Sequence, residues 1–229
     1  MIRFFATIAV AVVLSGCVVP ERRLSITAVR ELRIADVLVE VPAPAPGEPD
    51  KIVWPKAALA YAQLKMPVAT RPGQVGRDPA GASVPSTPEQ AEWDTKFTAL
   101  LQSPAAVTQV RGTLAELVRN SFKKRFVDQP AGHRPVKLKV IVKGLQAPGG
   151  AANFSADVIV LDGVTGRPLS EYPALVGTRA PSQAFVPASP IGILVGLAAL
   201  AVVDQLRGDP AYDAIDDASS RFSGWLLRE

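Results

Sequence analysis

The sequence predicts an α+β fold in which helices cover an antiparallel sheet made of a three-strand meander and an N-terminal strand. Three strand-like segments follow one another between residues 136 and 178, which predicts a meander. Apolar side chains recur at three- and four-residue steps from Val107 to Phe126, which predicts a long helix before it. A second helical pattern follows Asp209-Pro210. This order of strand, proline-rich loop, helices, three-strand meander and helices is that of an α+β fold.

A first strand is predicted within Leu24–Val41, an extended stretch rich in branched apolar side chains. Leu32 and Ile34 share one face, and the alternation changes phase at Ala35-Asp36. A change of phase predicts a β-bulge or a break between two strands. The prolines of residues 42–46 end this strand, since proline cannot donate to a ladder.

Helices and one long loop are predicted next. Ile52–Trp54 is interpreted as a short apolar contact, and Ala57–Lys65 as a brief helix. Residues 67–88 hold five prolines and three glycines, which indicates a proline-rich surface loop. Thr87 is the expected N-cap of the following helix, with Pro88 at its first position.

The helix that begins at Ser103-Pro104 carries the strongest helical stripe of the sequence. Its apolar positions are Val107, Val110, Leu114, Leu117, Val118, Phe122 and Phe126. It ends in Lys123-Lys124-Arg125, charges that complement a helix C-terminus. A membrane-binding or partner-binding patch is the alternative interpretation of these three residues.

In the meander, apolar residues alternate with lysines from Val136 to Lys143, as expected for a strand with one wet face. Turns are predicted at Gln146–Ala151 and at Asp162–Gly166, separating strands Phe154–Leu161 and Leu169–Thr178. The last helix has the predicted apolar stripe Ile215, Phe222, Trp225 and Leu226. Its early acids, Asp213, Asp216 and Asp217, favour the helix dipole.

The residues supply no recognisable catalytic, cofactor or metal site. His133 is the single histidine and Cys17 the single cysteine, which excludes two-histidine zinc sites and Cys-His nucleophiles. Ser121 and Lys124 match Ser-x-x-Lys, but the companion motifs of penicillin-binding enzymes are missing. The adjacent carboxylates Asp216 and Asp217 point about 100° apart on a helix, so they cannot share a site.

Composition excludes other classes of function. The net charge is +4 and the basic residues are scattered, whereas a nucleic-acid-binding protein would show a clustered patch. One cysteine allows no disulfide within the fold, so packing must supply the stability.

The N-terminus has the organisation of an export signal. Arg3 is followed by the apolar run Phe4–Leu14 and by the small residues Ser15-Gly16 before Cys17. The run is shorter than the roughly 17 to 25 residues that a membrane-spanning helix needs. The segment Leu14-Ser15-Gly16-Cys17 resembles the lipobox of bacterial lipoproteins. An ordinary signal or membrane anchor with an incidental cysteine is the alternative.

The resemblance implies a diacylglyceryl group on the sulfur of Cys17, cleavage before that residue and acylation of the new amine. Residues 1–16 would be the signal peptide, 17–23 a lipidated tether and 24–229 a single periplasmic domain. Val18 stands where aspartate would mark inner-membrane retention, so the resemblance implies the outer membrane.

We therefore expect an outer-membrane-anchored, non-enzymatic lipoprotein that binds an envelope protein partner and no nucleic acid. One alternative is that Ile191–Val203, which carries no charge, inserts into lipid or packs against other copies. A cell-wall hydrolase using Ser121 or His133 is the second. The element order of residues 104–228 is similar to small envelope lipoproteins and, more distantly, to the curli-secretion lipoprotein and the amino-terminal domain of the Tol-B translocation protein. This likeness transfers no functional residue.

Overall fold

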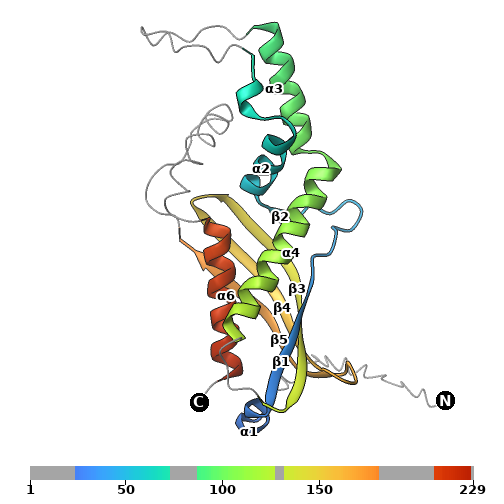
Figure 1. The fold of residues 1–229 in the computed structure, drawn as a ribbon, viewed down its shortest axis with the longest axis vertical. Coiled ribbons are helices and arrows are strands. Elements are labelled where there is room, and N and C mark those ends of the chain that lie inside the picture. The colour runs from blue at the N-terminus through green and yellow to red at the C-terminus, as the bar shows by residue number, and fades with distance from the viewer. Residues whose placement is uncertain (1–23, 73–86, 127–131, 181–208, 228–229) are drawn as a thin grey trace, which may run out of the picture.

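The computed structural model describes residues 24–72, 87–126, 132–180 and 209–227 (Figure 1). The elements in chain order are α1 (Ile26–Arg30), β1 (Leu32–Glu40), β2 (Ile52–Val53), α2 (Pro55–Lys65), the 3₁₀ turn η1 (Val68–Thr70), α3 (Pro88–Leu101), α4 (Pro104–Phe126), β3 (Arg134–Gly149), β4 (Ala151–Asp162), β5 (Pro168–Arg179) and α6 (Pro210–Leu226). Helices α4 and α6 cover one face of the sheet, which confirms the predicted α+β class.

The sheet has five strands in the order β1-β3-β4-β5, with β2 also paired to β3. The meander β3-β4-β5 is antiparallel as predicted, whereas β1 and β2 run parallel to β3. The expectation that the N-terminal strand would be antiparallel is therefore wrong. Helices α2, α3 and α4 lie between β1 and β3 in the chain, and such long crossovers allow parallel pairing.

The predicted change of phase in β1 is confirmed, because the β1–β3 register shifts between Ile34 and Asp36. Its predicted start is wrong. Residues Ile26–Arg30 form the helix α1, and the Ser25 hydroxyl oxygen accepts a hydrogen bond from the Ala28 amide at 3.2 Å. This serine N-cap is the local signal that an extended assignment overlooked.

Of the two turns predicted in the meander, one is shorter in the structure and the other is confirmed. The turn predicted over Gln146–Ala151 is shorter, because β3 continues to Gly149 and β4 begins at Ala151. The turn after Asp162 is confirmed, and the Asp162 carboxylate accepts hydrogen bonds from the amides of Val164 and Thr165. The Thr165 amide, together with the side chains of Arg134 and Thr165, holds the pKa of Asp162 far below its usual range.

The core lies between the sheet and the two helices that cover it. On α4 the buried residues are Ala106, Val110, Leu114, Val118, Phe122 and Phe126, and on α6 they include Ile215, Phe222 and Leu226. The predicted helical stripes are thus confirmed at most positions. Val107 is an exception, since 40% of it is exposed, and Trp225 is half-buried.

Helix α6 approaches β5 through very small residues. A Cβ atom placed on Gly177 of β5 would lie 1.9 Å from the carbonyl oxygen of Ala214 and 2.8 Å from the Cβ of Ala218. Ala214 and Ala218 are fully buried. Only glycine at position 177 therefore allows α6 to lie this close to the sheet.

Helices α2 and α3 form a smaller apolar cluster at one end of the molecule (Figure 1). Its buried residues are Leu59, Ala62 and Phe97. The predicted start of α3 is confirmed, because Thr87 and Gln90 form a reciprocal capping box and Pro88 follows the cap. The helix predicted over Ala57–Lys65 begins two residues earlier, at Pro55.

Three predictions concern residues outside the described ranges: the signal with Cys17, the apolar run Ile191–Val203 and most of the proline-rich loop at 67–88. In the described part of that loop, Val68–Thr70 forms a 3₁₀ turn. The assignment of residues 24–229 to one domain stays a prediction.

Candidate functional site

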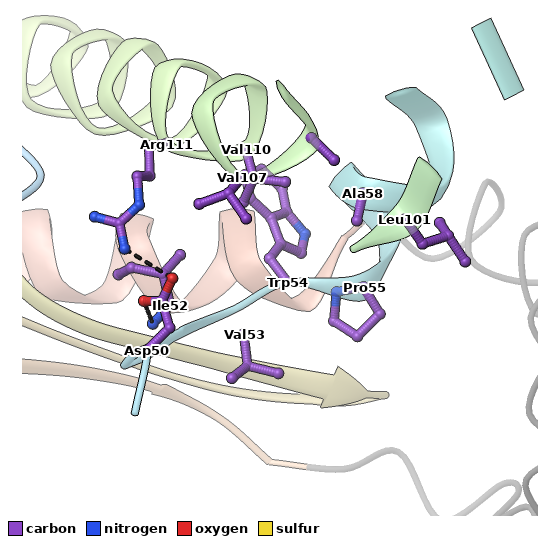
Figure 2. Close-up of a pocket in the computed structure, with 11 residues that line it drawn as sticks. Asp50, Ile52, Val53, Trp54, Pro55, Ala58, Leu101, Val107, Val110 and Arg111 are labelled. Atoms are coloured by element: carbon purple, nitrogen blue, oxygen red, sulfur yellow. Dashed lines mark hydrogen bonds and ion pairs between the residues drawn. The ribbon is translucent and has the colours of Figure 1, made fainter. Parts of the chain in front are cut away.

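The candidate site is an apolar groove where β2, the start of α2 and the first turns of α4 meet (Figure 2). Its cavity has a volume of about 200 Å³. The residues that line it are Asp50, Ile52, Val53, Trp54, Pro55, Ala58, Leu101, Ala106, Val107, Val110 and Arg111. The residues that line the groove come from before, within and after helices α2 and α3 in the sequence. No single stretch of the sequence therefore contains the groove.

Trp54 is one of the residues that line this groove. It precedes Pro55 at the start of α2 and is 5% exposed. Its indole nitrogen donates a hydrogen bond to the Asp209 carboxylate at 3.2 Å, and its ring meets that of Tyr212 edge-on. Asp209 also accepts from the Ala211 amide as the N-cap of α6. The indole is therefore held in one orientation by the first turn of α6.

A charged pair lies at one end of the groove (Figure 2). The Arg111 guanidinium donates to the Asp50 carboxylate at 2.7 Å and to the carbonyl oxygen of Pro42. Asp50 in turn accepts from the Ile52 amide at 2.9 Å. The arginine side chain is only 13% exposed, so the pair neutralises a charge that burial would otherwise make unfavourable. These hydrogen bonds from Arg111 hold the segment before β2 against α4.

Two valines at the rim remain accessible: Val53 is 37% and Val107 is 40% exposed. The sequence pattern predicts Val107 on the buried stripe of its helix, and Ile52–Trp54 only as a short apolar contact. Within the groove the two charged side chains are paired with each other. The arrangement can hold an apolar group, and its lining offers no free acid, base or nucleophile.

The sequence-derived candidates for chemistry lie elsewhere. The Ser121 hydroxyl lies 3.1 Å from that of Ser219 and 3.5 Å from the Asp216 carboxylate, between α4 and α6. Its partners are thus a serine and an acid, while Lys124 of the Ser-x-x-Lys match is exposed on α4. His133 is exposed just before β3.

The early acids of α6 do more than favour the helix dipole. Asp213 pairs with Arg179, Asp216 with Arg125, and Asp217 accepts from the Thr178 amide at 3.0 Å. They attach α6 to its neighbours, a role that the dipole interpretation missed. In residues 24–72, 87–126, 132–180 and 209–227, no group of three histidine, cysteine or acidic side chains is placed to hold a metal ion.

No helix among the described segments combines the length and the apolar character needed to cross a bilayer. No protein-family model and no curated protein sequence matches the chain. The crystal structure of a candidate lipoprotein from Caulobacter crescentus CB15 is similar over 51% of this chain and 85% of that one, with 17% sequence identity and a TM-score of 0.32. A likeness of this strength carries no argument about function.

Proposed function

We propose that this chain is a lipid-anchored, non-enzymatic protein of the bacterial outer membrane that binds another envelope protein. The observation that carries the proposal is the run Leu14-Ser15-Gly16-Cys17 after an apolar segment, with the only cysteine of the chain at its end. Val18 in the next position favours the outer membrane. One acyl chain binds a bilayer reversibly, whereas two or more anchor a protein stably.

Replacing Cys17 with alanine tests the anchor. We expect the wild-type chain, expressed in a bacterial host, to incorporate a palmitate analogue, and the Cys17→Ala variant to incorporate none, because the thioether is the attachment point. Gel fluorescence after labelling measures this. Equal labelling of both chains would contradict the proposal, and a Ser15→Ala variant, which keeps a small residue before the cysteine, should label like the wild type.

For the binding role, the groove beside Trp54 is the proposed contact. Its volume of about 200 Å³ is below the roughly 300 to 1,000 Å³ of typical small-molecule sites. A cavity of this size suits one or two apolar side chains of a protein partner, the kind of anchor that dominates protein interfaces. The accessible Val53 and Val107 would then be covered by the same partner.

Two experiments test this contact. Photocrosslinking from position 107 in intact cells first identifies the partner, with crosslinking from position 64 as the control. The Val107→Glu variant then tests whether the partner covers the groove. Leu64 is 76% exposed and does not line the groove. The purified partner should then bind Val107→Glu at least about tenfold more weakly than the wild type, since the variant buries an unpaired carboxylate. It should bind Leu64→Glu unchanged.

Two results would contradict the groove proposal. One is equal affinity of the partner for both glutamate variants. The other is a crosslink from position 107 that forms only within the chain, which would mean that the chain fills its own groove.

A further inference from the structure

Basic residues stand on α1, on β1, in the last turn of α4 and at the start of β3. Figure 1 shows α1 at the end of the molecule opposite to α3 along the long axis. We call this the basic end. It consists of Arg30, Arg33, Lys123, Lys124, Arg125 and Arg134, all of them exposed. Backbone contacts join α1 and β1 to β3: the Arg134 amide donates to the carbonyl oxygen of Glu31 at 2.9 Å, and Leu32 pairs with Arg134. The ion pair between Lys123 and Asp36 joins the end of α4 to β1.

Only part of this positive charge is neutralised. Lys123 pairs with Asp36 at 3.2 Å, Arg134 with Asp162 at 2.9 Å, and Arg125 with Asp216. Among the described residues, Arg30, Arg33 and Lys124 make no ion pair. Glu31, next to Arg30 in the chain, is an exposed acid on the same segment. The basic end therefore keeps an excess of positive charge.

The same end is close in sequence to the proposed anchor. Leu24, the first residue that the structure describes, comes seven residues after Cys17. A fully extended chain covers at most about 3.6 Å per residue, so Leu24 can lie no farther than about 25 Å from the lipidated residue, and the first residue of α1, Ile26, no farther than about 32 Å. At physiological ionic strength the Debye length is about 8 Å, so direct approach of the basic end to the bilayer is needed for attraction.

We propose that the basic end rests on anionic phospholipid headgroups and thereby directs the α2–α3 end, with the groove, away from the membrane. The inference rests on the proposed lipid anchor, which places α1 beside the bilayer. Clustered lysines and arginines bind anionic lipid surfaces additively. The three unpaired cations come from α1, β1 and α4, so they would fix the orientation of the whole domain and not only of its tether.

Lipid composition and matched charge reversals test the proposal. The purified full chain, labelled with a fluorophore at Thr27→Cys in α1, is reconstituted into vesicles of phosphatidylcholine alone or with 30% phosphatidylglycerol. Energy transfer to an acceptor lipid reports how close α1 lies to the bilayer. We expect transfer to be at least about twofold higher in the anionic vesicles, and this excess to disappear at high salt because surface charges are then screened.

Two double variants with the same change in net charge separate orientation from overall charge. Arg30→Glu/Lys124→Glu should abolish the excess transfer, whereas Lys65→Glu/Lys96→Glu, on α2 and α3, should keep it. Equal transfer in both vesicle types, or equal loss in both variants, would overturn the proposal. Palmitate labelling of the wild-type chain is measured separately. If this chain takes up no label but its energy transfer still depends on anionic lipid, the lipid anchor is refuted and the basic end remains as the membrane contact.

Discussion

Replacing Gly177 with alanine is expected to destabilise the protein by about 3 kcal/mol or more, at the upper end of what overpacking costs. The new Cβ would lie 1.9 Å from the backbone oxygen of Ala214 and 2.7 Å from the backbone nitrogen of Ala218. These are helix backbone atoms, which cannot rotate away like a flexible side chain. Helix α6 must therefore move off the sheet, and urea unfolding followed by circular dichroism measures the loss.

Gly112 provides the matched control. It lies within α4 and is exposed, and apart from the adjacent backbone of its own helix no atom of the described residues lies within 4 Å of a Cβ placed there. Gly112→Ala should raise stability by roughly 0.5 to 1 kcal/mol, because alanine favours a helix interior over glycine. An unchanged urea midpoint for Gly177→Ala would show that α6 does not pack against β5 as closely as described.

Replacing Phe222 with alanine is expected to cost about 3 to 5 kcal/mol, the range found for large-to-small substitutions in cores. Phe222 is fully buried on α6, and its ring centroid lies 5.9 Å from that of Phe122, 6.0 Å from Phe126 and 5.7 Å from Trp225. The cavity left by the ring would lie between α4, α6 and β5, so the contacts that join these three elements would all weaken.

Two further substitutions show how the loss of stability depends on the size and the burial of the side chain that is removed. Phe222→Leu, which keeps an apolar side chain, should cost less than about 1.5 kcal/mol. Val164→Ala should change stability by less than about 0.5 kcal/mol, because Val164 is 84% exposed in a turn. Thermal unfolding with near-ultraviolet circular dichroism follows the aromatic cluster directly. A loss below 1 kcal/mol for Phe222→Ala would contradict the placement of this ring at the centre of the core.

Elements whose signals are local could be predicted from the sequence. Thr87 and Pro88 are adjacent and mark the start of α3, and the apolar stripe from Val110 to Phe126 follows helical spacing. The bulge in β1 is visible as a change of phase near Ala35. In each case the information lies within one or two turns of chain, where propensity and periodicity act.

Contacts between distant segments could not be predicted. The parallel pairing of β1 with β3 depends on how α2, α3 and α4 return the chain. The groove depends on the hydrogen bond between Trp54 and Asp209, which lie 155 residues apart in the sequence. The exposure of Val107 follows from the same assembly, since periodicity marks an apolar face but does not say which part of it a neighbour covers.

The candidate functional residues also differ in whether their signal is local or depends on distant segments. Cys17 is singled out by a contiguous motif, so the sequence alone can propose lipid attachment. The partners of Ser121 and Asp216 come from the contact between α4 and α6, and no spacing rule in the sequence shows them. Structural pairing between α4 and α6 accounts for these polar residues.

The parallel pairing of β1 with β3 also has a consequence for the order of folding. Synthesis makes β1 early, but its partner residues begin at Arg134. The β3-β4-β5 meander and the α2–α3 pair can form from neighbouring segments, whereas β1 must wait for the closure of a long loop. The strand nearest the proposed anchor is therefore expected to be among the last to join the sheet, with its edge open to other chains until it does.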